Sequence, residues 1–119
     1  MKKAIFKSTI CALAFSSANL FADGFVEGIP VVVQKSDYGS IHLIYVQFDK
    51  PVAPLGCTTG SGVVVLDSNE SSKPALSMAL AAQASGKKFR CYVVTNQCSQ
   101  IDGSVATVPI CGYYPAIVN

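Results

Sequence analysis

Apolar runs separated by glycine, proline and polar residues divide the chain into short segments with the pattern of β-strands. The segment 41–48, "IHLIYVQF", is rich in β-branched and aromatic residues, and its even positions form the expected core face in its second half. The run "VVVLD" at 63–67 has the length of a buried strand. An earlier strand, "GFVEGIPVVVQ" at 24–34, is interrupted by Gly28 and Pro30. These patterns predict a mainly β protein.

A single helix pattern follows the third strand, in "SSKPALSMALAAQASG" at 71–86. Two adjacent serines at its start can serve as the N-cap, and Pro74 suits the first turn. Gly86 stands where a left-handed residue often ends a helix. The sequence therefore predicts a helix over Lys73–Ser85.

Two more strands follow the helix, "KFRCYVV" at 88–94 and "SVATVPIC" at 104–111, joined by the turn "SQIDG" at 99–103. Pro109 has no N–H to donate to a sheet, so it should mark an edge or a bulge. The resulting order β-β-β-α-β-β is the order of the OB fold, a five-stranded, partly open barrel. We expect one OB-like domain, mainly β with one helix, over residues 23–119; a β-sandwich with an incidental helix is the alternative.

The N-terminal segment 1–22 has the three regions of a secretory signal peptide: lysines, an apolar run, and small residues ending at Ala22. Asp23 would then be the first mature residue, with cleavage after Ala18 as the alternative. The apolar run is shorter than the roughly 20 residues of a membrane span, so we expect no transmembrane span in the mature chain. The short lysine-containing start is typical of bacterial export to the periplasm or beyond.

Removing this segment changes the charge and the cysteine count. Three of the nine basic residues lie in it, which leaves the mature chain near neutral and without the basic stripe that nucleic acid binding requires. Cys11 is lost as well. An even number of cysteines in a small exported domain indicates disulfides, with three connectivities open. These cysteines are Cys57, Cys91, Cys98 and Cys111.

No group of residues identifies a metal site, a cofactor or a catalytic centre. The chain has no CxxC spacing, and its only histidine, His42, lies in a predicted strand far from any cysteine and without a nucleophile motif. The glycine-rich segment 56–62, "GCTTGSG", lacks the lysine and the strand-to-helix context of a phosphate loop. We therefore expect no enzyme, no metal and no cofactor. The acids beside turns show no paired spacing: Asp49, Asp67, Glu70 and Asp102. Five tyrosines could stack on sugars or bases, although packing explains most of them: Tyr38, Tyr45, Tyr92, Tyr113 and Tyr114.

The segment from Gly56 to Cys98 carries a resemblance to a known group. It contains "GC", a strand ending in Asp67, and "KPALSMALAAQASGKKFRCYVVTNQC" at 73–98. In these motifs it resembles a family of small uncharacterised secreted bacterial proteins, whose organisation is similar to the OB-fold B subunits of bacterial AB-type toxins. The resemblance implies an OB-like fold, a glycan ligand and a homo-oligomer. The segment 99–114 replaces the polar, often tryptophan-containing segment of that family.

The helix has no charged residue after Lys73, although an isolated surface helix usually carries a charged face. Its outer face is then a candidate interface with another subunit or a partner, as in the pore-lining helices of toxin B pentamers. The alternative is that alanine, serine and glutamine form an ordinary exposed face, since alanine favours helix. The candidate interface residues are Ser77, Ala81 and Ala84.

Strand register predicts the disulfide pairing. A hairpin centred near Ile101 places Cys91 directly opposite Cys111 on one face, within reach of a disulfide. Cys57 and Cys98 then remain as the second pair. A bulge at Pro109 would shift the register by one residue and turn Cys111 to the other face.

Two classes of function follow. The first is a non-catalytic binding module that recognises a glycan or a protein. The alternative is a structural or interaction protein of the envelope, which docks through its apolar helix or through the edge strand near Pro109. An enzyme comes third.

Overall fold

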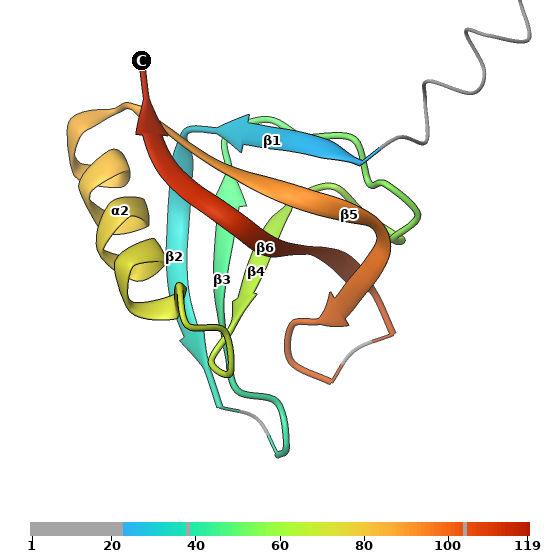
Figure 1. Cartoon of the computed structure of the whole chain (residues 1–119). Coiled ribbons are helices and arrows are strands. Elements are labelled where there is room, and N and C mark those ends of the chain that lie inside the picture. The colour runs from blue at the N-terminus through green and yellow to red at the C-terminus, as the bar shows by residue number, and fades with distance from the viewer. Residues whose placement is uncertain (1–22, 38, 104) are drawn as a thin grey trace, which may run out of the picture.

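The structure is a computed structural model that describes residues 23–37, 39–103 and 105–119. The predicted signal peptide, 1–22, lies outside the described residues. The described chain is mainly β with one helix (Figure 1). Its elements are β1 (Gly24–Gly28), β2 (Pro30–Ser36), β3 (Leu43–Phe48), β4 (Gly62–Leu66), α2 (Ser72–Ser85), β5 (Lys88–Gln100) and β6 (Thr107–Val118).

The six strands form one mixed sheet in the order β1-β5-β6-β4-β3-β2. All neighbouring strands are antiparallel except β4 and β6, which run parallel and meet at Val64 and Ile110. The expectation of a mainly β chain with one helix is confirmed. The described sheet, however, has six strands in the order β-β-β-β-α-β-β and is not closed into a barrel, whereas a five-stranded, partly open barrel in the order β-β-β-α-β-β was expected. The predicted first strand is two strands, β1 and β2, which pair with different partners at opposite edges of the sheet, and no ladder joins them in the described part of the chain.

The break between β1 and β2 occurs where the sequence places Gly28 and Pro30. A Cβ on Gly28 would lie 2.6 Å from Cγ of Phe48, so only glycine lets the chain pass this ring without displacing it. The backbone of Ile29 is held by Asp49, whose N–H donates to the Ile29 carbonyl at 2.9 Å and whose Oδ1 accepts from the Ile29 N–H at 3.3 Å. The interruption predicted from the sequence is thus a fixed corner of the fold.

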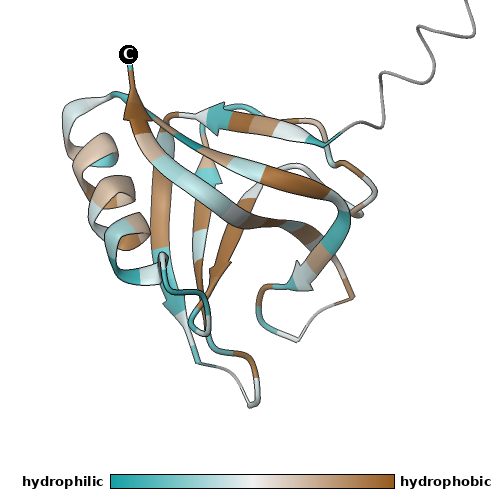
Figure 2. Cartoon of the chain, viewed as in Figure 1, coloured by the Kyte–Doolittle hydropathy of each residue, from teal (hydrophilic) through white to brown (hydrophobic). Residues whose placement is uncertain are grey.

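Helix α2 begins one residue before its predicted start and ends at the predicted residue, Ser85. Gly86 has a φ of 69°, the left-handed conformation expected after a helix, and Lys87 N–H donates to the Ala82 carbonyl at 3.0 Å. The N-cap, Ser71, makes no capping hydrogen bond with its side chain. The helix contacts β2, β5 and β6, and Figure 2 shows it mainly in pale and brown tones. None of the helices in the described chain has the length and apolar character needed to cross a bilayer.

The core has two parts, and β3 contributes to both. Ile44, Val46 and Phe48 lie in the main cluster, as the even-face prediction requires, but Leu43 and Tyr45 on the odd face are buried in a second cluster. This second face is covered by Val108 of β6 and by Ile101 in the connection between β5 and β6. The main cluster also includes the following residues: Val26, Val63, Val65, Ala75, Ala79, Ala82, Phe89, Cys91, Val93 and Cys111.

Strands β5 and β6 are longer than predicted, and their register differs from the predicted one. Val93, not Cys91, is the partner of Cys111, and Cys98 is the partner of Pro109. Between these two pairs the chain advances by five residues in β5 but by only two in β6. Residues 94–97 therefore bulge out of β5. The sequence placed the irregularity at Pro109, but the extra residues lie on the opposite strand.

The structure contains two disulfides, Cys57–Cys98 and Cys91–Cys111, each with a Cα separation of 5.6 Å. These are the expected pairs. The strand register from which the Cys91–Cys111 pair was predicted is nevertheless wrong, because these two cysteines are offset by two residues instead of directly opposed. Both bonds indicate an oxidising extracellular or periplasmic compartment.

Candidate functional site

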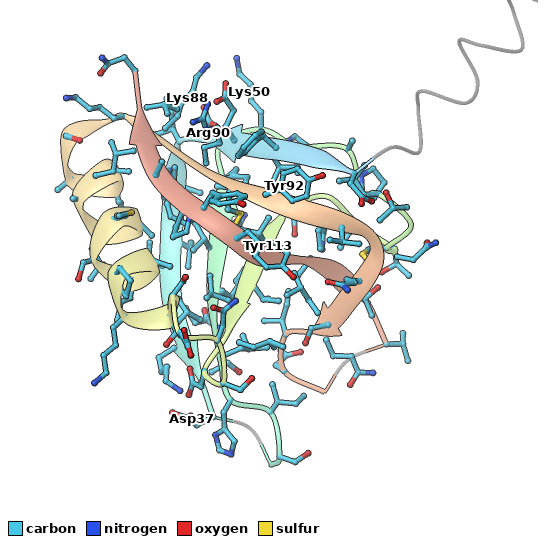
Figure 3. The ribbon with its side chains drawn as sticks, viewed as in Figure 1. Asp37, Lys50, Lys88, Arg90, Tyr92 and Tyr113 are labelled. Carbon is cyan, nitrogen blue, oxygen red and sulfur yellow. A yellow bond between two sulfur atoms is a disulfide. The ribbon has the colours of Figure 1, made fainter. Side chains whose placement is uncertain are left out.

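Strand register aligns three aromatic residues across β1, β5 and β6. Phe25 is the partner of Tyr92, and Tyr92 is the partner of Tyr113. Side chains alternate along a strand, and the neighbours Val26 and Cys91 are buried in the main core. The three rings therefore point away from the core, on the outer face of the sheet. Figure 3 shows Tyr92 and Tyr113 together on this side of β5 and β6.

The rings contact one another and stay accessible to solvent. Phe25 and Tyr92 meet edge to face with centroids 5.3 Å apart, and the centroids of Tyr92 and Tyr113 are 6.4 Å apart, both within the range of interacting aromatic pairs. Phe25 is 53% exposed, Tyr113 55% and Tyr114 69%. We call Phe25, Tyr92, Tyr113 and Tyr114 the aromatic face.

Tyr114 joins this group through an unusual backbone conformation. Strict alternation would send it to the side opposite Tyr113, but its φ of 55° and the register shift between Tyr92 and Arg90 bend β6 at this point. Its ring centroid lies 6.0 Å from that of Tyr113 and 6.3 Å from that of Tyr92. A bulky residue with positive φ costs about 1 to 3 kcal/mol, and such residues cluster at functional sites. The bend therefore adds a fourth ring to the face at a cost in stability.

Charged side chains border the aromatic face on the side of β1. The guanidinium carbon of Arg90 lies 4.7 Å from the centroid of Phe25, a cation–π contact. Glu27 and Lys88 form an ion pair at 3.5 Å, and both line a small pocket together with Lys50, which is labelled in Figure 3. Within the described residues, Nε of Arg90 is buried without a hydrogen-bond partner. This border supplies hydrogen-bond donors and acceptors beside the rings.

A groove of about 630 Å³ adjoins the aromatic face at Tyr113. Leu66 and Ile110 contribute apolar surface to it, while the polar side chains of Asn69, Glu70 and Gln97 line the rest. Tyr113 is therefore shared by the aromatic face and the groove.

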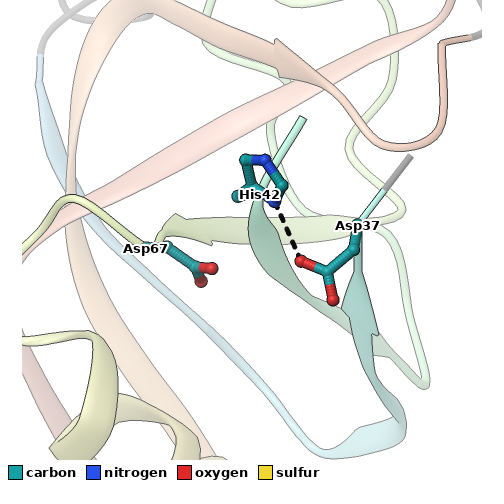
Figure 4. A group of neighbouring side chains, drawn as sticks. All are labelled: Asp37, His42 and Asp67. Carbon is teal, nitrogen blue, oxygen red and sulfur yellow. Dashed lines mark hydrogen bonds and ion pairs between the residues drawn. The ribbon is translucent and has the colours of Figure 1, made fainter. Parts of the chain in front are cut away.

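A second polar cluster lies at the opposite end of the sheet from Lys88, where Figure 3 labels Asp37. Nζ of Lys35 is 2.6 Å from a carboxylate oxygen of both Asp37 and Asp67, and Nδ1 of His42 is 3.0 Å from Asp37 (Figure 4). The hydrogen bonds from His42 and Lys35 lower the pKa of Asp37, and those to Asp37 and Asp67 raise the pKa of Lys35. Oxygens and the imidazole lie close enough to hold a cation, but the ammonium of Lys35 already supplies the positive charge there.

The residues expected from the sequence are dispersed over the molecule. Ser77, Ala81 and Ala84 are all exposed on the outer face of α2. His42 precedes β3 and is exposed. Of the acids predicted beside turns, Asp67 belongs to the polar cluster described above. Asp37 belongs to it as well, although the sequence did not single this residue out. Of the tyrosines, Tyr45 is buried with its hydroxyl 2.8 Å from Oγ of Ser61, and Tyr38 lies outside the described residues.

The sequence missed the aromatic face for a local reason. Gly112 and Pro115 discourage a strand, so the last predicted strand ended at Cys111, before both tyrosines. In the structure β6 continues to Val118, because past Ile110 it is paired with β5 alone and Pro115 needs no partner on its free side. The pattern "YY" after an alternating strand was the available signal.

Comparison with known proteins found no matching family model, no matching curated protein and no matching solved structure. The residues and their geometry are therefore the basis for inferring the function.

Proposed function

We propose that the protein is an exported, non-catalytic binding module that recognises glycans through the aromatic face. The observation that carries this proposal is the gathering of four rings from three strands, three of them more than half exposed. Burying apolar surface stabilises a protein by about 25 cal/mol per Å², and this stabilisation is lost where the surface stays in water. Contiguous exposed patches of this kind mark interaction sites. The left-handed backbone at Tyr114 supports the same conclusion.

The chemistry of the face fits a sugar better than it fits a nucleic acid. A pyranose ring offers a flat surface of C–H groups, which suits an aromatic ring, and an edge of hydroxyl groups, which suits polar side chains. Tyr113 and Tyr114 provide both ring and hydroxyl, and Arg90 lies at the border. Glu27 offsets the charge of Lys88, and the mature chain is near neutral, so a phosphate backbone would gain little net electrostatic attraction at this border. The resemblance to toxin B subunits also supports a glycan.

A protein ligand or a second copy of the chain is the second candidate, and the outer face of α2 favours it. Leu80 is 47% exposed there and is flanked by Ser77, Ala81 and Ala84, with no charge among them. Val31 on edge strand β2 is exposed as well, and its carbonyl accepts a hydrogen bond from the α2 side chain of Gln83. An envelope protein could dock through this surface.

The strand pairing also supports an OB-like interpretation of the fold. If β1 and β2 are counted as one interrupted strand, the chain order becomes β-β-β-α-β-β, and that single strand borders both β5 and β3. Only Ile29 separates the two halves, so the sheet must curl to bring its edges together. An experimental structure with β1 and β2 far apart beyond this corner would contradict the interpretation.

Export to the periplasm or the exterior is the proposed location, with cleavage after Ala22. Asp23 then begins the mature chain, and its Oδ1 accepts the N–H of Thr95 at 2.7 Å, just before β1 starts. N-terminal sequencing of protein recovered from the periplasm and the medium should give Asp23. An N-terminus at Asn19, or a chain retaining residues 1–22, would contradict this site.

A glycan array tests the proposed function. The mature protein should bind a restricted set of glycans, and Tyr113→Ala should lower the affinity by about thirtyfold, the effect of a typical hot-spot residue. Leu80→Ala is the matched control, because it removes an exposed apolar side chain from α2 and should leave binding unchanged. An empty array, or equal losses in the two variants, would refute glycan recognition by the aromatic face.

A further inference from the structure

We propose that the binding site continues from the aromatic face into the neighbouring groove, so that the ligand is an oligosaccharide chain and not a single terminal sugar. This inference rests on the proposed function and adds the length and path of the ligand. Tyr113 is the residue that links the two parts, since its ring contacts Tyr92 and also lines the groove.

The fold itself opens the groove. Strands β4 and β6 are partners only at Val64 and Ile110, and no β4–β6 ladder continues past this point in the described chain. The loop after β4 is fastened across the opening, because Nδ2 of Asn69 donates to the Gly112 carbonyl at 3.0 Å. The groove is thus the space between two diverging strands, closed at one side by a loop with a fixed anchor.

The opposite wall comes from the bulge in β5. Residues 94–97 leave the regular ladder, and this displacement brings Gln97 to the groove. The bulge is held at two points, by the disulfide between Cys57 and Cys98 and by the Asn96 N–H, which donates to the Leu55 carbonyl at 2.8 Å. A wall fixed in this way loses little conformational freedom when a ligand binds.

The lining of the groove suits the same ligand as the aromatic face. Leu66 and Ile110 offer apolar surface for the C–H groups of a sugar, and the side chains of Glu70 and Gln97 offer acceptors and donors for its hydroxyls. The volume of about 630 Å³ lies within the roughly 300 to 1,000 Å³ of small-molecule sites. A chain stacked on Tyr113 can therefore extend in one direction over Tyr92 and in the other into the groove.

Calorimetric titration with sugars of increasing length tests this inference. The probes are chito-, cello- and malto-oligosaccharides of one to six units together with the strongest glycan from the array and its terminal monosaccharide. We expect at least one of these series to bind about tenfold more tightly as a chain of three or more units than as a monosaccharide. Gln97→Ala should lower the affinity for the chain by about two- to tenfold, the effect of one lost hydrogen bond, and leave the monosaccharide unaffected.

Gln34→Ala is the matched control, because Gln34 is exposed on β2 and does not line the groove. Equal affinities for monosaccharide and chain, with no effect of Gln97→Ala, would overturn the extended site and leave the aromatic face as a site for one sugar. Absence of binding by every probe would overturn the proposed function and this inference together.

Discussion

The aromatic face and the outer face of α2 are both exposed surfaces with little charge, but they are built in different ways. On α2 the exposed residues are mostly small, and Leu80 is the one large apolar side chain among them. On the sheet, Phe25, Tyr113 and Tyr114 are exposed together and pack around Tyr92. Large rings gathered in one place are a stronger sign of a binding site than small residues along a helix.

The difference also lies in what each surface requires of the fold. Alanine on an exposed helix costs almost nothing, since it is the best helix former. The aromatic face leaves ring surface in water and holds Tyr114 at a φ of 55°, which costs stability. A feature that lowers stability is more informative about function than one that is neutral.

The largest effect on stability and binding is expected from removing the disulfide behind the aromatic face. The disulfide Cys91–Cys111 lies directly beneath the aromatic face, with both cysteines almost fully buried. Replacing both by alanine should lower the free energy of unfolding by about 2 to 5 kcal/mol in urea titrations and abolish glycan binding. An unchanged unfolding midpoint would show that the bond does not stabilise the sheet behind the face.

The next effect concerns the left-handed residue of the aromatic face. Tyr114→Gly should cost about 1 kcal/mol less of the free energy of unfolding than the loss of a neighbouring ring does, because glycine adopts positive φ without strain, while glycan affinity falls. Tyr113→Gly is the control: it also removes one exposed ring but relieves no strain, so both stability and affinity should fall. A loss of stability in Tyr114→Gly as large as that in Tyr113→Gly would contradict the strain assigned to this position.

A smaller effect is expected on the helix. Ala84→Glu places a charge on the outer face of α2, where an exposed surface position should change affinity and stability by less than about 0.5 kcal/mol. We expect unchanged glycan binding and an unchanged molecular mass in light scattering. A fall in mass to that of a single chain would show that the outer face of α2 is an interface between copies of the chain, contrary to this expectation.

The smallest effect lies at the exposed cluster of Lys35, Asp37 and His42. The lowered pKa of Asp37 means that its contribution to stability is present above its ordinary value of 3.8 and is lost as the pH falls through its folded pKa. The raised pKa of Lys35 means a contribution that is lost only as the pH rises through its folded pKa, above 10.5. In an NMR titration Asp37 should have a midpoint below 3.8, and Asp37→Asn should bring the pKa of Lys35 down. A midpoint of 3.8 or higher would contradict this network.

Elements specified by nearby residues were predictable from the sequence. The helix could be located to within one residue because Pro74 and Gly86 act on their own backbone. Strands β3 and β4 follow from runs of β-branched residues, and the break in the first strand follows from Gly28 and Pro30.

Features that depend on pairing between distant segments could not be located in this way. The register of β5 and β6 depends on the bulge at 94–97 and on the bend at Tyr114, and neither leaves a clear local pattern. The aromatic face follows from this register together with that of β1, because Phe25 is far from Tyr92 in sequence. The cysteine pairs match the expected pairs even though the register argument failed, since cysteines offset by two residues can still approach each other.

NMR chemical-shift mapping with the strongest glycan from the array tests the central claim most directly. We predict that aromatic ¹H and ¹³C signals of Phe25, Tyr92, Tyr113 and Tyr114 shift on titration, while the amides of Ser77, Ala81 and Ala84 stay in place. Shifts confined to those three residues of α2, with the aromatic signals unchanged, would contradict the claim.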